Sequence, residues 1–314
     1  MENTEKLSKF AKYAWFVLAW NIVVILWGVF LRASKSGDGC GQHWLTCKGE
    51  VVPSAPELKT VIEFSHRITS SLDGLIVIGL VIAAVIVWYR RRSPESGRVM
   101  RSAIACLVFV IIEGLLGAGL VLTGNTAETL TPARPFWAAA HLVNTLILLA
   151  FLSLTAWLAS GGGRIRFADK KAAGAIIAGI GLLLLVGISG SVAALASMLF
   201  PSATLAEGIA NDFSATSNML IRLRIVHPIL SVAIAVFLIF TAGWLRTRSG
   251  GGHAVTRWSN ILSLLLLAQI AFGAATLLML APIVMQLGHL LLADAVWISF
   301  ILLSANFLSA ESTA

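Results

Sequence analysis

Eight long apolar stretches constrain this chain more than any other feature of its sequence. A helix of about 20 apolar residues crosses the ~30 Å hydrocarbon core of a bilayer, and a chain in lipid must pair its backbone polar groups within such a helix. The sequence therefore predicts an all-α polytopic membrane protein with eight transmembrane helices, at residues 11–31, 67–88, 102–122, 137–158, 172–200, 222–244, 258–280 and 285–308.

The composition excludes several other classes of protein. Hydrophobic residues make up 58% of the 314 and charged residues 12%, about half of the ~25% typical of soluble domains. The chain is therefore neither disordered nor a cytosolic nucleic-acid-binding protein, and three cysteines are too few for a secreted disulfide scaffold. A polar segment precedes the first stretch and no small-residue cleavage site follows it, so we expect a retained helix rather than a signal peptide.

Basic residues predict the orientation in the membrane. Fifteen of the 23 lysines and arginines lie before the first stretch or between the second and third, fourth and fifth, and sixth and seventh stretches. By the positive-inside rule this side is the cytoplasm, and both termini lie there. The net charge of +8 is thus an orientation signal, and no nucleic-acid partner is expected.

Two halves are visible in the sequence. The glycines at 161–163 separate residues 1–160 from 161–314, and each part holds four stretches. Residues 112–118 also weakly resemble residues 268–274. We expect two pseudo-repeated four-helix bundles of parallel topology, because an even number of helices preserves the orientation.

Four histidines recur at the outer starts of the even-numbered stretches: His66, His141, His227 and His289. A lone histidine in a helix is more often a structural hydrogen-bonding residue, but four at equivalent positions favour ligation. Two imidazoles from two helices of a bundle can hold a metal between them. Haem iron suits such a pair better than zinc, which usually takes four ligands. We therefore expect one haem site in each half.

The first outer loop carries Cys40 and Cys47 on the oxidising side of the membrane, where a disulfide can form. A structural staple and a redox role are equally open. A metal site that includes His43 is a third alternative, although it lacks a fourth ligand. Cys106, inside a predicted helix, has no evident partner and is expected to be a small buried residue.

Glu63 stands three residues before His66, so a helical turn places both on one face. There the carboxylate could act as a general base or stabilise a developing cation; alternatively it is a helix-start carboxylate favoured by the helix dipole. Arg67 could pair with a haem propionate or anchor the helix at the interface. In the second half Arg224 takes the place of Glu63. This difference predicts chemistry in the N-terminal half and a structural or electron-transfer cofactor in the other.

Three further acids, Asp73, Glu113 and Asp294, lie within the apolar stretches. Intramembrane acids are costly and are functional by default. Asp73 follows His66 by seven residues, on the same helical face, and is a candidate for a proton route. For Asp294 a hydrogen-bonded packing role is equally open.

The Cys-x6-Cys loop, the run Glu63-Phe64-Ser65-His66-Arg67 and the histidine on each even-numbered helix resemble the haem A synthase family of Cox15/CtaA-type membrane proteins, over the whole chain. The resemblance implies an oxidoreductase that converts a methyl group of haem O to a formyl group, giving haem A for terminal oxidases. The residue roles it implies are axial ligation of the substrate haem by His66 and His141, ligation of a haem b cofactor by His227 and His289, catalysis by Glu63, and a Cys40–Cys47 disulfide.

The same resemblance implies a plasma-membrane location, with haem O synthase and cytochrome oxidase assembly factors as candidate partners. Outer arginines remain for the haem propionates, and the candidates are Arg67, Arg222 and Arg224. The oligomeric state stays open, with a homo-oligomer as one alternative. Two other functions also stay open: a b-type cytochrome with two bis-histidine haems, and a haem transport or chaperone protein of the same fold without oxidation activity. Because all four histidines lie on the outer side, the sequence argues against electron transfer across the membrane.

Overall fold

The computed structural model describes residues 8–126 and 128–310, and this part of the chain is helical, with a single β-bridge between Cys47 and Glu50. Eight segments are long and apolar enough to cross a membrane, which confirms the predicted multi-pass helical fold. They are α1 (Lys9–Ala33), α2 (Leu58–Arg91), α3 (Pro94–Leu122), α4 (Arg134–Ala159), α5 (Lys170–Leu199), α7 (Met219–Arg224) together with α8 (Val226–Arg248), α9 (His253–Leu278) and α10 (Ile283–Ala310).

The second helix differs most from its predicted range, since α2 begins at Leu58 rather than at residue 67. Hydropathy marks only the part of a helix that lies in hydrocarbon, and the first turns of α2 carry polar side chains that the first outer loop covers. Glu63 and His66 therefore lie inside the helix, where backbone hydrogen bonds hold them rigidly, rather than at its start.

The third outer connection also differs from expectation, because residues 200–221 contain a short helix, α6 (Leu205–Phe213), and the start of α7. The side chain of Thr204 caps α6 by accepting a hydrogen bond from the backbone N–H of Glu207. The chain turns at Ile225, between α7 and α8. Pro228 has no N–H to donate to the carbonyl of Arg224, which explains the break at this point.

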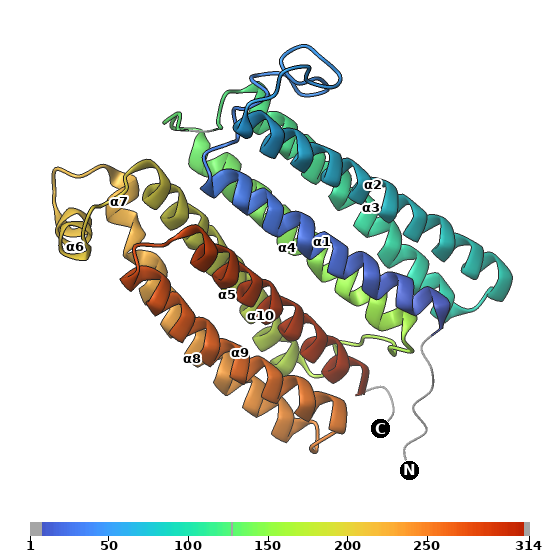
Figure 1. Cartoon of the computed structure of the whole chain (residues 1–314). Coiled ribbons are helices and arrows are strands. Elements are labelled where there is room, and N and C mark those ends of the chain that lie inside the picture. Colours follow the sequence, from blue (N-terminus) through green and yellow to red (C-terminus); the bar gives the residue numbers. More distant parts are fainter. Residues whose placement is uncertain (1–7, 127, 311–314) are drawn as a thin grey trace.

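The helices form two groups that follow one another along the chain, α1–α4 and α5–α10 (Figure 1). Each group has an apolar core, and the core of the first group also takes in Trp297 and Ile301 of α10. The groups meet where α1 and α4 of the first pack against α5 and α10 of the second. The indole Nε1 of Trp297 on α10 donates to the carbonyl of Leu146 on α4 at 2.7 Å. α4 and α10 are accordingly the most enclosed of the eight spans.

Figure 1 shows the first outer loop, which joins α1 to α2, at one end of the bundle together with α6 and α7. The first residues of α1 and the last of α10 lie at the opposite end. The connections rich in arginine and lysine join α2 to α3 and α8 to α9 at that second end. The prediction of the orientation requires such a separation, with the basic connections at one end of the bundle and the first outer loop at the other.

Candidate functional site

Three of the four candidate histidines pack their rings directly on a glycine of the preceding membrane helix. A Cβ atom built on any of these glycines would lie 2.8–2.9 Å from the Cε1 atom of the ring, which is closer than carbon atoms approach in proteins. Each imidazole therefore fits only because glycine has no side chain. The pairs are His66 on Gly28, His227 on Gly190 and His289 on Gly273. Sequence reasoning missed these glycines, because one glycine among many in apolar helices carries no signal of its partner.

In the C-terminal group the ring of His227 on α8 lies next to the ring of His289 on α10. Their centroids are 6.3 Å apart and their planes are at 89°. A metal ion that binds two imidazoles at about 2 Å each separates the ring centroids by roughly 6 Å. The spacing therefore fits a single iron atom held between the two rings.

Hydrogen bonds orient these two imidazoles. Nδ1 of His227 lies 3.1 Å from the hydroxyl of Ser189 on α5, which leaves Nε2 for a ligand. Nδ1 of His289 is buried without a hydrogen-bond partner in the described chain. The amide Nε2 of Gln269 on α9 lies 3.4 Å from Nε2 of His289. Orphaned buried nitrogens are rare in folded proteins, so Nδ1 is the nitrogen of His289 that remains open to a further partner.

In the N-terminal group, Nδ1 of His66 is likewise buried without a hydrogen-bond partner among the described residues. Nδ1 of His141 lies 3.3 Å from Oε1 of Glu113 on α3, at an angle outside hydrogen-bond geometry. Glu113 accepts hydrogen bonds from the amide of Asn144, at 2.6 Å, and from the hydroxyl of Thr145. The intramembrane carboxyl group of Glu113 thus lies next to the ring of the candidate ligand His141.

The other polar groups within the spans are separate from the histidines. Asp73 is buried and accepts a 2.7 Å hydrogen bond from the amide of Asn21 on α1. Asp294 is buried on α10, and its Oδ2 has no hydrogen-bond partner in the described chain. Cys106 is buried as expected and lies 3.5 Å from the hydroxyl of Thr155. The proton route through Asp73 stays a prediction.

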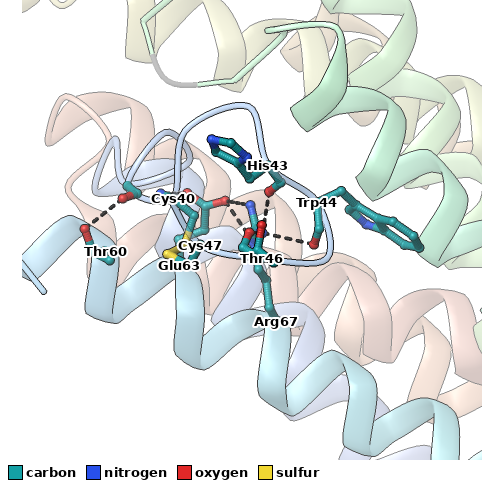
Figure 2. A network of polar contacts seen from close by, with 9 residues as sticks. Cys40, His43, Trp44, Thr46, Cys47, Thr60, Glu63 and Arg67 are labelled. Carbon is teal, nitrogen blue, oxygen red and sulfur yellow. Dashed lines mark hydrogen bonds and ion pairs between the residues drawn. A yellow bond between two sulfur atoms is a disulfide. The ribbon is translucent and has the colours of Figure 1, made fainter. Parts of the chain in front are cut away.

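Cys40 and Cys47 form a disulfide, with their Cα atoms 4.4 Å apart, and both residues are fully buried. Since each sulfur is bonded to the other, the alternative of a metal site with His43 does not occur. The bridge joins two residues seven positions apart and closes a short loop that folds over the outer end of α2 (Figure 2).

Two side chains of α2 tie this loop to the helix. Glu63 is 3% exposed, and its Oε2 accepts a 2.9 Å hydrogen bond from the backbone N–H of Cys40. Its Oε1 is paired with the guanidinium of Arg67, one helical turn further along. Figure 2 shows the same guanidinium directed into the loop, where Nη1 donates to three backbone carbonyls, those of His43 at 2.6 Å, Trp44 at 3.1 Å and Thr46 at 2.9 Å.

A close backbone approach completes the attachment of the loop. The hydroxyl of Thr60 donates to the carbonyl of Gly39 at 2.7 Å. A Cβ on Gly39 would lie 2.3 Å from the carbonyl oxygen of Lys59, so only glycine fits. The disulfide loop, Glu63 and Arg67 therefore form one rigid unit next to His66. Residues 20 or more positions apart meet here, and no local pattern in the sequence predicts the contact.

Arg224 has a similar anchoring role in the second half. Its guanidinium is paired with Asp212 of α6 at 2.7 Å and donates to the carbonyl of Gly208 at 3.2 Å. Arg222 is exposed on α7. Of the three arginines predicted to meet propionates, Arg67 and Arg224 are thus already engaged with their own outer loops.

A family model described as "COX15-CtaA: Cytochrome oxidase assembly protein" matches residues 11–301 of the chain. The chain belongs to this family. A protein of Thermus thermophilus named "Protoheme IX farnesyltransferase" is 41% identical over 307 residues, which cover 98% of this chain and 50% of that protein. The chain thus spans about half the length of the Thermus relatives.

Proteins named "Heme A synthase" are similar over a shorter region. The one from Halalkalibacterium halodurans is 39% identical over 132 residues, or 42% of each chain. The one from Symbiobacterium thermophilum is 34% identical over 146 residues, which are 46% of this chain and 43% of that protein. Membership of the COX15-CtaA family confirms the resemblance read from the cysteine loop and the histidines.

Proposed function

We propose that this COX15-CtaA protein is a haem A synthase, an oxidoreductase that converts a methyl group of haem O to a formyl group. The observation that carries the proposal is the close pair of imidazoles, His227 and His289, whose ring centroids lie 6.3 Å apart, the spacing expected of a bis-histidine iron site. The relatives named "Heme A synthase" support it.

The N-terminal half is proposed to bind the substrate, with His66 and His141 as axial ligands of haem O. The buried, unpartnered Nδ1 of His66 and the glycine under its ring support this assignment. The C-terminal half is proposed to hold haem b between His227 and His289. When bound, haem b would supply one-electron transfer.

The intramembrane acids of the first half support this division of labour. Glu113 in the first half corresponds to Gln269 in the second, within the two similar segments. Asp73 follows its histidine by seven residues, whereas Ile234 holds that position after His227. Oxidation of a methyl group to a formyl group consumes one water and releases four protons and four electrons. A half that carries out this step needs proton acceptors, and at these two positions only the first half has carboxyl groups, the buried Asp73 and the partly buried Glu113.

Glu63 is proposed as the catalytic carboxylate. Its helical position holds it one turn from His66, and the N–H of Cys40 together with Arg67 fixes the orientation of its two oxygens. A carboxylate held in this way can stabilise positive charge or accept a proton near the substrate without reorganising. The disulfide loop above it limits access of bulk water from the outer side.

We propose the plasma membrane as the location, with both termini cytoplasmic, in agreement with the separation of basic loops from the disulfide loop. A haem O synthase is the proposed partner, and cytochrome oxidase assembly factors are further candidates. The Thermus protein named "Protoheme IX farnesyltransferase" contains a region similar to 98% of this chain, which supports a partner that acts on haem.

The test is to express the chain in membranes that supply haem O and to extract and separate the haems. The wild-type protein is expected to produce haem A, while His66→Ala and Glu63→Gln produce little or none. Bound haem b with unaltered haem O would instead indicate a b-type cytochrome or a haem carrier. Full conversion by Glu63→Gln would remove Glu63 from the catalytic assignment.

A further inference from the structure

Arg32 stands out among the basic residues on the outer side of the N-terminal half. It lies on α1 one turn beyond Gly28, on the face that packs against the ring of His66. Arg134 lies on α4 two turns before His141 and is buried. The two arginines therefore flank the outer side of the candidate substrate histidines, and the charge of Arg32 interacts with both Arg134 and His141.

The guanidinium of Arg32 makes no hydrogen bond or ion pair with any residue that the structure describes. The nearest outer acids with an ion pair are bound to other cations: Glu63 is paired with Arg67, Glu128 with Lys35, and Asp38 lies 3.9 Å from Lys59. A partly enclosed cation at the edge of a membrane protein is costly unless it is compensated. An anion bound near the outer end of α1 would supply this compensation.

We propose that Arg32 binds a propionate carboxylate of the haem held by His66 and His141, while Arg134, whose guanidinium donates to the carbonyl of Thr129, adds positive charge nearby. This inference rests on the proposed function, since it assumes a haem in the N-terminal half. The porphyrin ring is apolar and suits the bundle interior, but its two carboxylates need cations as they leave water. A guanidinium offers paired N–H donors that match a carboxylate. Arg67, the candidate from the sequence, already donates to Glu63 and three loop carbonyls.

The test compares two forms of the same ligand. Haem-depleted protein in phosphatidylcholine nanodiscs is titrated with protohaem IX and with its dimethyl ester, in which both propionates are uncharged. His66→Ala identifies the binding event that belongs to the N-terminal half. We expect Arg32→Gln to weaken that event about tenfold or more for the diacid, as loss of a hydrogen bond to a charged group predicts, and less than about twofold for the diester. Arg32→Lys should recover part of the affinity.

Lys59→Gln is the matched control, since it also removes one positive charge from the outer side, and neither ligand should respond to it. The inference is overturned if wild-type protein binds acid and ester equally, or if Arg32→Gln weakens both to the same extent. It is also overturned if the effect appears only when anionic lipid is added, because the bound anion is then a headgroup phosphate. An intact disulfide and an unchanged thermal midpoint in Arg32→Gln show that the variant is folded.

The outcome is separable from that of the proposed function. Arg32-dependent binding of the diacid without production of haem A would retain the carboxylate site and reject the synthase assignment. Production of haem A without a preference for the diacid would retain the synthase assignment and reject the carboxylate site.

Discussion

Replacing Arg67 by methionine should release the disulfide loop from α2. The variant loses two bonds to Glu63 and three to backbone carbonyls of the loop. The carbonyls can turn to water, but the Glu63 side chain is only 4% exposed and is left with one donor, the N–H of Cys40. The loss of one partner from a buried ion pair costs about 3–5 kcal/mol.

The lower end of that range applies here, because 19% of the Arg67 side chain is exposed. A cost of about 3 kcal/mol raises the population of the open loop roughly 100-fold, at about 1.4 kcal/mol for each factor of ten. Hydrogen exchange of the Cys40 amide measures this directly, since its N–H is the donor to Glu63. The rate at which a phosphine reduces the Cys40–Cys47 bond should rise by a similar factor.

Arg90→Met is the control, because it removes an exposed arginine from the opposite end of the same helix. The double variant Glu63→Gln/Arg67→Met tests the electrostatic reason. Without the carboxylate no unpaired charge remains, so the double variant should protect the Cys40 amide better than Arg67→Met alone. The reasoning would be refuted if the Cys40 amide of Arg67→Met exchanged as slowly as in the wild-type protein. It would also be refuted if that amide exchanged faster in the double variant than in Arg67→Met.

Two further substitutions probe other parts of the molecule. Gly190→Ala places a Cβ 2.9 Å from the ring of His227 and should lower the haem content of the C-terminal half. The measurement is the haem-to-protein ratio of the purified protein. Gly181→Ala on the same helix is the control, because its Cβ meets open space and should leave that ratio unchanged. Asp169 caps α5 and is paired with Arg248, whose hydrogen bond lowers the pKa of the Asp169 carboxyl below its ordinary value. Because the folded-state pKa is depressed, this stabilisation is present at neutral pH and is lost as the pH falls through that pKa. Asp169→Ala should therefore lower the thermal midpoint at neutral pH and hardly change it at a pH below that pKa. An equal drop in the thermal midpoint at both pH values would contradict the pairing.

The anchoring of the loop bears on the interpretation of Glu63. The same carboxylate that the sequence indicates for catalysis also holds the N–H of Cys40. A loss of activity in Glu63→Gln can therefore arise from the chemistry or from a displaced loop. Exchange of the Cys40 amide separates these causes, since the substituted glutamine keeps an acceptor oxygen and a purely chemical defect leaves that amide protected.

The sequence alone determined the fold class. Hydropathy is a local property and the bilayer thickness is fixed, so eight apolar stretches suffice to predict eight helices. The helical period likewise placed Glu63 and His66 on one face, and the two cysteines in an outer loop made their disulfide an expectation that the structure confirms.

Tertiary structure alone decided how these pieces meet. Glu63 and Cys40 are 23 residues apart, and Arg67 binds loop carbonyls 21–24 residues away. The glycine under each of three histidine rings belongs to a different helix from the histidine itself. Such contacts depend on the angle and register at which helices pack, which hydropathy along a single helix does not encode. For the same reason the sequence indicated Arg67 for the propionates, whereas packing occupies Arg67 with the loop and leaves Arg32 beside the site.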